Sequence, residues 1–535
     1  PTRRSSDLDG YRVVCTGTSR LPRFLLFPYT TLFRSGDLVE IKVKNNMGGV
    51  DNESLTIHWH GIHQRGTPYS DGVSVLTQCA IPAGKEMKYS FTAYPSGTHF
   101  WHSHMPGQAA NGISGALIVR KTDDPYLSTL ESGDDFVLLV TDWFNITGQA
   151  MLQKVIDKDV EGDMWSDAPF QSALVNGHGG SVTELIPSDG GPPVSYDGNA
   201  IFRVMKGQFY RFRIINSGSA FAFHISIDRH RFKVIAVDGG LVLPKQGNGF
   251  VDSIVLQVGE RCDILLKTAQ GNMTHNNFYI RAKTLQDTDA SSPHEVRAVL
   301  RYPIDGQRED IRFWGATTTT TTIIPTTRVD PVEFDLMNVK MDPASDVIQS
   351  GTPFSPVAAH YNMLMTGASE SPYHWGVNNI YFRKPDIPGP LLGQNVTALQ
   401  ASGAVQSHTQ LFKLKGNEVV ELFVDNPTVM WHPFHLHGHY FAVMALGDET
   451  TLPPEEPVTN NTNPVYKDTL AVPPMGWAII RFYTDNPGAW FFHCHIEYHL
   501  GEDNTLPLPS LTTTHHNTTT NHSNSYRDGD GGFIY

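Results

Sequence analysis

The segment AWFFHCHIEYHL, residues 489–500, places one cysteine between two histidines and adds a third histidine five positions after the cysteine. Residues i and i+2 of a β-strand share one face, so His493 and His495 point to one side and Cys494 points to the other. One short strand can therefore supply ligands to two different metal sites. A single histidine pair of this kind is weak evidence, because zinc enzymes use the same ligands.

The His-x-His spacing recurs along the chain. With 24 histidines among 535 residues, random placement would give about one such triplet. The sequence contains five: His58/His60, His102/His104, His435/His437, His437/His439 and His493/His495. Each pair can present two imidazoles to one centre from the same face of a strand. The number of pairs, rather than any single pair, indicates a centre that holds several metal ions.

The segment WHPFHLHG divides its histidines between two sites. His435 and His437 face one side of a strand, whereas His432 lies three positions before His435 and falls on the opposite side. We therefore expect His432 to join Cys494, and His499 to reach them if the chain turns after its strand. Two imidazoles and one cysteinate are the ligand set of a blue copper centre.

Eight paired histidines remain for a second centre, and they divide naturally as three, three and two around three metal ions. They are His58, His60, His102, His104, His435, His437, His493 and His495. Zinc is disfavoured because it has no redox chemistry, whereas a thiolate site beside an imidazole cluster is useful if electrons move between them. The chain is therefore predicted to bind copper.

The elements that must position these ligands read as β-strands from Gly36 onward. Segments such as DLVEIKVKNN, KYSFTAY, GALIVRK and VVELFVDNP alternate apolar and polar residues or end in turn residues. Such strands, separated by Gly, Pro and Asn, favour β-sandwiches or barrels. Joints are expected at 121–135 and at the threonine run 317–322, which reads as a solvated linker. The predicted β domains are 36–125, 130–310 and 325–500.

The two ends of the chain depart from this pattern. The peptides PTRRSSDL and PYTTLFRS are translations of one oligonucleotide in two reading frames, and that oligonucleotide resembles a sequencing-library adapter. Residues 1–35 are therefore predicted not to be native protein sequence and are left out of the domain assignment. Residues 501–535, rich in Thr, Asn and His, are predicted to be an aberrant or disordered tail.

Composition restricts the partners and the compartment. A formal net charge of −14 argues against nucleic acid and anionic membranes, because both repel a net anion. The sequence has no run of about 18 apolar residues, so no membrane-spanning helix is expected. Glycosylation sequons favour a secreted, extracellular glycoprotein, and they begin at Asn52, Asn145, Asn272, Asn395 and Asn460.

From GDLVEIKVKNN to EYHLG the chain resembles the multicopper oxidases and, within them, the laccases. The motifs that carry the resemblance are IHWHGI, GTHFWHSHMPGQAANGISGALIV, HPFHLHGHYF and DNPGAWFFHCHIEYHLG. The segments YSDGVSVLTQC, GERCDILLKTAQ and KDTLAVPPMGWAIIRFYTDNPG are more similar to the invertebrate laccases than to the fungal ones. The resemblance implies an all-β fold of three cupredoxin-like Greek-key domains in series. It places a three-copper cluster between the first and third domains, with the middle domain as a spacer.

The same resemblance implies four copper ions and assigns their ligands. The type 2 copper would be held by His58 and His437. The two type 3 coppers would be held by His60, His102 and His495, and by His104, His435 and His493. The type 1 copper would be held by His432, Cys494 and His499.

The implied activity is the one-electron oxidation of phenols or aromatic amines at the type 1 copper, with O2 reduced to water at the cluster. Cys494 would carry the electrons, and the carboxyl groups of Asp71 and Glu497 would supply protons. A simpler interpretation makes Asp71 a turn residue and Glu497 an exposed acid. Cys79 resembles a half-cystine whose family partner is missing here, and Asn504 replaces the apolar axial residue of relatives, so no axial ligand is assigned.

Two alternatives to a laccase remain open. The first is a metal oxidase such as a ferroxidase with the same copper set, which would need acidic residues beside His432 to receive Fe(II). The second is an inactive, copper-poor chain whose altered ends prevent the sites from forming.

Overall fold

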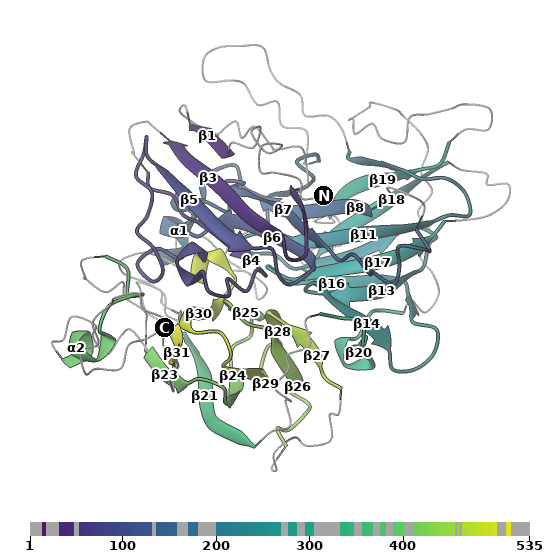
Figure 1. The fold of residues 1–535 in the computed structure, drawn as a ribbon. Helices are drawn as coiled ribbons and strands as arrows, with labels where there is room; N and C mark the ends of the chain where they lie inside the picture. The colour runs from purple at the N-terminus through teal and green to yellow at the C-terminus, as the bar shows by residue number, and fades with distance from the viewer. Residues whose placement is uncertain are drawn as a thin grey trace.

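The computed structural model describes residues 13–17, 31–47, 53–130, 135–157, 170–179, 199–268, 276–285, 295–303, 332–346, 356–367, 375–380, 389–401, 411–454, 458, 463–499 and 510–514. These residues form three domains in series, built almost entirely of β-strands (Figure 1). The predicted all-β class of cupredoxin-like domains is confirmed. The threonine run 317–322 lies outside the described residues.

The first domain is a β-sandwich. Its strands are β1 (Val13–Gly17), β2 (Thr31–Arg34), β3 (Leu38–Met47), β4 (Ile57–His60), β5 (Glu86–Thr92), β6 (Gly97–Ser103) and β7 (Ser114–Arg120). They form one sheet in the order β1-β3-β5 and a second in the order β2-β7-β6-β4. Strands β1 and β2 lie within 1–35, the range predicted not to be native, and pair with β3 and β7.

The middle domain holds two larger sheets and helix α1. Its elements are β8 (Asp135–Trp143), α1 (Gly148–Ile156), β9 (Ser172–Val175), β10 (Ile201–Arg203), β11 (Phe209–Asn216), β12 (Phe223–Ile227), β13 (Phe232–Val237), β14 (Gly240–Pro244), β15 (Phe250–Val251), β16 (Ser253–Leu256), β17 (Arg261–Lys267), β18 (Asn277–Thr284) and β19 (Glu295–Arg301). One sheet has the order β10-β19-β18-β12-β16, and the other contains β14-β13-β17-β11-β8-β9.

The third domain is a second sandwich. Its elements are β20 (Val339–Met341), β21 (Val357–Gly367), β22 (Trp375–Val377), α2 (Val396–Ala401), β23 (Leu411–Lys415), β24 (Val419–Asn426), β25 (His432–Leu436), β26 (Phe441–Gly447), β27 (Val465–Lys467), β28 (Thr469–Val472), β29 (Gly476–Tyr483), β30 (Gly488–Cys494) and β31 (Ser510–Thr514). Its sheets have the orders β22-β21-β24-β29-β26-β27 and β23-β31-β30-β25-β28. Strand β20 pairs instead with β14 of the middle domain, and β31 falls within the predicted tail.

Strand β4 shows how the sequence aims its histidines. All four of its residues are buried. The indole of Trp59 packs into the core of the first domain, 5.4 Å from the ring of Tyr89 and 5.3 Å from that of Phe91. Because side chains alternate along a strand, burying this large aromatic residue turns His58 and His60 toward the opposite face.

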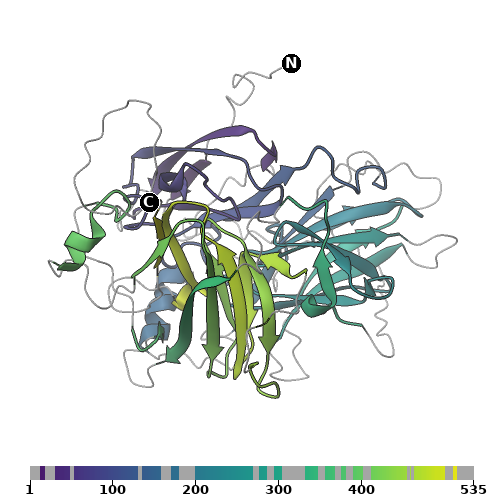
Figure 2. The ribbon, with the colours of Figure 1, turned by 60° about the horizontal axis from the view of Figure 1, so that its bottom comes forward.

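That opposite face meets the third domain. Strand β4 lies next to β25 and β30 in Figure 1, and Figure 2 shows the third domain packed against both of the others. The middle and third domains share one continuous hydrophobic core, which also takes in Val73 and Leu76 of the first domain, whereas most of the first domain's core is a separate cluster. The histidine strands also match in register, since His58 lies opposite His102 and His435 lies opposite His493.

Candidate metal centre

A compact site of one cysteine and two histidines lies inside the third domain. His432 begins β25, and Cys494 ends the neighbouring antiparallel strand β30. The chain then turns through a short 3-10 helix, Glu497–His499, which brings His499 back toward the sulfur. The Sγ atom of Cys494 lies 3.3 Å from Nδ1 of His499 and 3.7 Å from Nδ1 of His432. All three side chains are fully buried, at 1% exposure or less.

Eight histidines meet where the first and third domains face each other. In each of several overlapping groups the possible ligand atoms lie within 4.8 Å of one another. The groups are His58, His60 and His435; His60, His102 and His495; His104, His437 and His493; and His58, Asp71 and His437. Distant histidine pairs from the two ends of the chain therefore converge on one place.

One group of neighbouring side chains differs from the predicted ligand sets, although His58 also lies in a group with Asp71 and His437. His437, and not His435, joins His104 and His493, and its Nε2 lies 2.9 Å from Nε2 of His493. Nε2 of His435 instead faces Nε2 of His58 at 3.4 Å. Strand parity places both residues on one face, but His437 lies beyond the end of β25, where the chain turns.

Most of the cluster imidazoles use Nδ1 to bond protein oxygen atoms and turn Nε2 toward the cluster. The carbonyl oxygens of Asp71, Ser103, Asp468 and Cys494 lie 2.7–2.9 Å from Nδ1 of His58, His102, His435 and His493. Bonds of this kind fix the tautomer and the orientation of a ligand ring. His60 is oriented the other way, with Nδ1 facing Nε2 of His495 at 3.1 Å.

Burial favours the neutral form of several cluster imidazoles, and the neutral form is the one that binds metal. Burial and the neighbouring His58 lower the pKa of His102 to about 3. Burial likewise lowers the pKa of His493 to about 3. For His104, burial and the adjacent imidazoles lower the pKa well below its usual value. These three histidines therefore offer uncharged lone pairs at neutral pH.

Two nitrogen atoms test directly whether a metal fits. Nε2 of His102 and Nε2 of His104 are buried and have no hydrogen-bond partner in the part of the chain that the structure describes. Buried polar atoms normally have a partner, so ligation of an ion would account for both. Imidazoles with one cysteinate are also the donor set that suits copper. The residues present therefore fit copper.

The two predicted carboxylates lie beside the cluster. Oδ2 of Asp71 is 2.8 Å from Nδ1 of His437, and the Asp71 side chain is fully buried. The carboxylate of Glu497 accepts hydrogen bonds from the backbone N–H groups of Ala109 and Ala110, at 3.0 and 2.7 Å. Burial raises the pKa of Glu497 to about 8. Glu497 is only 8% exposed, which excludes the simpler interpretation of it as a surface acid.

Three residues that touch the cluster or its neighbours are not predicted from the sequence. They are Arg261 of the middle domain, and Asp468 and Thr469 of the third. A usable signal existed in the segment VYKDTLAV, where a charged Lys-Asp pair interrupts apolar strands. Buried charges are rarely retained without a partner, so such a pair indicates a network.

Gly259 of the middle domain leaves room for the ring of His495. Its φ is +85°, and a Cβ atom at this position would lie 2.8 Å from two carbon atoms of that ring. We expect Gly259→Ala to displace His495 and to weaken copper binding about tenfold. Copper per chain after dialysis against a chelator measures this effect.

Gly84→Ala is the matched control for that substitution. Gly84 has a similar φ of +75°, but no heavy atom lies within 4 Å of its added Cβ. Both variants therefore carry the same kind of backbone strain. Equal copper retention in the two variants would contradict the contact with His495.

The other histidines and cysteines that the structure describes belong to none of these ligand groups. His63 and His439 are buried but belong to no group of metal-ligating residues within the described ranges. In the middle domain, Nε2 of His230 lies 2.7 Å from the hydroxyl of Tyr302. His275 and His294 lie outside the described residues. Cys79 is exposed and forms no disulfide with any cysteine that the structure describes.

The fold has three β domains. A buried cysteine stands in the sequence between two histidines of a larger histidine cluster. This combination is typical of one class of copper oxidoreductases. Models of the multicopper oxidase family match residues 27–124, 134–303 and 382–510. The chain belongs to the multicopper oxidases.

Relatives with two kinds of name are similar to this chain. Laccase-5 of Trametes villosa is 32% identical over 87% of this chain and 80% of its own length. The iron transport multicopper oxidase fio1 of Schizosaccharomyces pombe is 29% identical over 87% of this chain and 68% of its own length.

Solved structures divide in the same way. The crystal structure of Fet3p, described as a multicopper oxidase that functions in iron import, has a TM-score of 0.71 at 25% identity and covers 92% of this chain and 87% of its own. The laccase from Botrytis aclada has a TM-score of 0.68 at 25% identity, with 88% and 80% covered. The similarity to invertebrate laccases stays a prediction.

Proposed function

We propose that the chain is a laccase-type oxidase, which removes single electrons from phenols or aromatic amines and reduces O2 to water. One observation carries the proposal. Cys494 of the mononuclear site is covalently flanked by His493 and His495, which belong to two different groups of the histidine cluster. A site that takes electrons one at a time is thereby joined directly to a centre with room for several ions.

We further propose how these residues would hold four copper ions. The mononuclear type 1 ion would be held by His432, Cys494 and His499. The type 3 pair would be held by His60, His102 and His495, and by His104, His437 and His493. The type 2 ion would be held by His58 and His435, which exchanges His435 and His437 relative to the sequence prediction. Copper, when bound, supplies the one-electron redox chemistry that the side chains lack.

Asp71 and Glu497 are proposed to hold and move the protons that water formation requires. The carboxylate of Glu497 accepts hydrogen bonds from the backbone N–H groups of Ala109 and Ala110 in the first domain. Its carboxyl group is therefore held where the first and third domains meet. We expect Glu497→Gln to lower turnover about 100-fold, because the amide cannot donate and recover a proton. Copper content and the blue absorption band should stay unchanged.

The substitution Glu449→Gln, at an exposed acid, is the control for Glu497→Gln. It should leave O2 uptake unaltered. Full turnover by the Glu497→Gln protein would remove Glu497 from the proton path.

A metal oxidase is the second candidate, because two of the similar proteins are named for iron transport or iron import. The hydroxyl group of Thr428 lies 2.9 Å from Nε2 of His432. This contact is to a neutral group, whereas an Fe(II) site would need carboxylates beside His432.

Turnover of a phenol and of Fe(II) on one copper-loaded preparation tests this choice. O2 uptake gives kcat/KM for each, and the Cys494→Ser protein gives the background oxidation of Fe(II). We expect kcat/KM to be higher for the phenol. A higher value for Fe(II) would establish the metal oxidase instead.

A copper-poor chain is the third candidate, because both ends of the sequence depart from the family pattern. Copper content and the blue band of the full 535-residue chain test this candidate. A colourless, copper-free product whose colour returns when native-like ends are supplied would establish this alternative.

Secretion and glycosylation are proposed from the sequons. Asn145 and Asn395 are exposed in the structure, so a glycan could be attached at either. Among the described residues no helix is long and apolar enough to cross a membrane. A shift in mass on treatment with an N-glycosidase, after expression in a eukaryotic secretory host, would support the proposal, and an unchanged mass would oppose it.

A further inference from the structure

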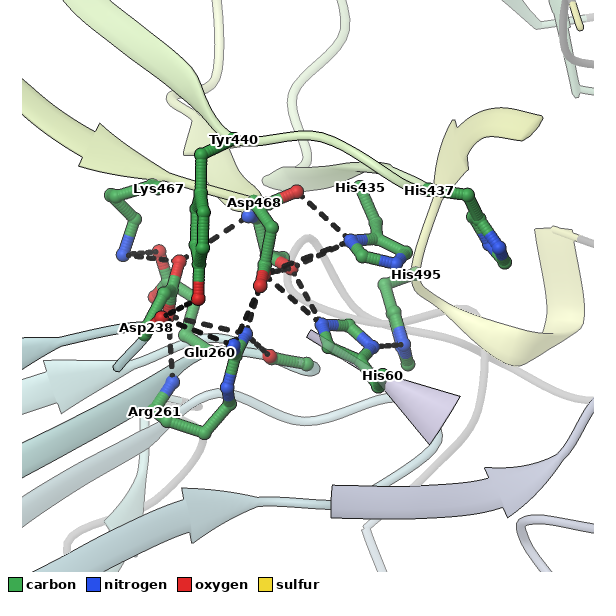
Figure 3. A network of polar contacts seen from close by, with 12 residues as sticks. His60, Asp238, Glu260, Arg261, His435, His437, Tyr440, Lys467, Asp468 and His495 are labelled. Atoms are coloured by element: carbon green, nitrogen blue, oxygen red, sulfur yellow. Dashed lines mark hydrogen bonds and ion pairs between the residues drawn. The ribbon is translucent and has the colours of Figure 1, made fainter. Parts of the chain in front are cut away.

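A buried network of charged residues joins the middle and third domains beside the histidine cluster (Figure 3). We call it the junction network, and it consists of Asp238, Glu260, Arg261, Lys467 and Asp468. Nζ of Lys467 lies 3.1 Å from Oδ2 of Asp238 and 3.2 Å from Oε1 of Glu260. None of these five residues is more than 8% exposed.

Arg261 contacts all three domains. From the start of β17 its guanidinium donates to the carbonyl oxygen of Thr98 in the first domain, at 3.0 Å. It forms a two-point ion pair with Asp468 of the third domain, with Nη2 2.6 Å from Oδ2. Burial alone would lower the pKa of Arg261, but the carboxylates of Asp468 and Asp238 outweigh it and raise that pKa. Arg261 is therefore a permanent cation at the junction.

Asp468 links Arg261 to the histidine cluster. Its Oδ1 lies 3.2 Å from Nε2 of His60, and its backbone carbonyl oxygen lies 2.9 Å from Nδ1 of His435. A carboxylate only accepts hydrogen bonds, so Nε2 of His60 is the nitrogen that donates. Asp468 thus contacts histidines from two of the ligand groups and from both domains that form the cluster.

Thr469 completes the contact with His60. Its hydroxyl donates to Oδ1 of Asp468 at 2.8 Å, which leaves a lone pair to accept from Nε2 of His60 at 3.0 Å. With the proton on Nε2, the free lone pair of His60 is on Nδ1, and Nδ1 is the atom that faces His495. The reversed ring orientation of His60 therefore follows from these two acceptors.

We propose that Asp468, held in place by Arg261 of the middle domain, is a positioning residue that selects Nδ1 as the metal-binding atom of His60. The middle domain then does more than separate its neighbours, because its guanidinium fixes the acceptor that orients a cluster ligand. This inference rests on the proposed copper cluster. Partners of ligand imidazoles commonly change metal affinity by about 10- to 100-fold when they are removed.

The test uses the full-length, copper-loaded protein and the substitutions Asp468→Asn and Thr469→Val. Lys467→Met is the matched control, because Lys467 is equally buried in the junction network and pairs with Asp238 and Glu260 rather than with Asp468. Thr469→Ser, which keeps the hydroxyl, is the conservative rescue. The readouts are copper affinity against a competing chelator and the share of bound copper that EPR detects.

We expect Asp468→Asn and Thr469→Val to weaken binding of the copper next to His60 by about 10-fold or more. The EPR-detectable share should rise, because a close copper pair is silent only while both ions are correctly held. The blue band of the separate Cys494 site should stay unchanged, and Thr469→Ser should behave like the parent protein. Lys467→Met should lower the unfolding temperature without changing either copper readout.

Two results would overturn the positioning role. One is an unaltered affinity and EPR share in Thr469→Val, which retains the charge pair and so tests the contact even if Asp468→Asn does not fold. The other is an equal change in Lys467→Met, which would show a general effect of the network. Failure of the proposed function is distinct, since the parent protein itself would then lack bound copper and the blue band.

Discussion

Replacing Cys494 by serine is expected to abolish the blue absorption band and to reduce oxidase turnover to the background of copper-free protein. The thiolate is the soft ligand of the mononuclear site, and a serine hydroxyl does not replace it. Cys494 is also the residue that joins that site to His493 and His495. The eight-histidine cluster does not use the sulfur, so its copper should remain. Absorption spectra, copper analysis and O2 uptake measure the three effects.

Cys79→Ser is the control for this substitution, because Cys79 is exposed and the ligand groups of the described residues do not include it. It should retain the blue band and full turnover. A blue band that survives in the Cys494→Ser protein would contradict the mononuclear site as assigned.

Replacing Arg261 by methionine is expected to lower the free energy of unfolding by about 3–5 kcal/mol, since it leaves buried carboxylates without their cation. The Arg261 side chain is fully buried and lies within 3.5 Å of Oδ1 of Asp238 as well as being paired with Asp468. The loss should destabilise the junction of the domains first. Chemical denaturation of the copper-free protein, followed by fluorescence and circular dichroism, would show it as an earlier transition.

Arg65→Met is the matched control for the arginine substitution. Arg65 of the first domain also pairs with the third, at 2.9 Å from Oδ2 of Asp485, but its side chain is 38% exposed. Water and salt screen such a pair, which contributes about 0–1 kcal/mol. If both variants unfold at the same denaturant concentration, the buried network does not hold the domains together in the way described.

Local pattern was sufficient for the β class and for the side of its strand to which each predicted ligand points. The period of two along a strand predicts that His493 and His495 share a face and that Cys494 points away from them. The structure places Cys494 with His432 and His499 and turns both neighbouring histidines to the cluster. These features depend only on neighbouring residues and on the geometry of one strand, so the sequence by itself determines them.

Tertiary structure decided which histidines lie together in each group and which residues from other domains contact them. The alternation of side chains along a strand could not distinguish His435 from His437, because both lie on the same face. They differ only in how far each side chain reaches across the interface between the first and third domains. His60 and Asp468 are separated by 408 positions, so no local pattern reveals their contact. Arg261, 207 positions before Asp468, reaches it only because the middle domain packs against the third. The period of a strand sets the direction of a side chain, whereas its distance and rotation toward another domain are set by how the sheets pack.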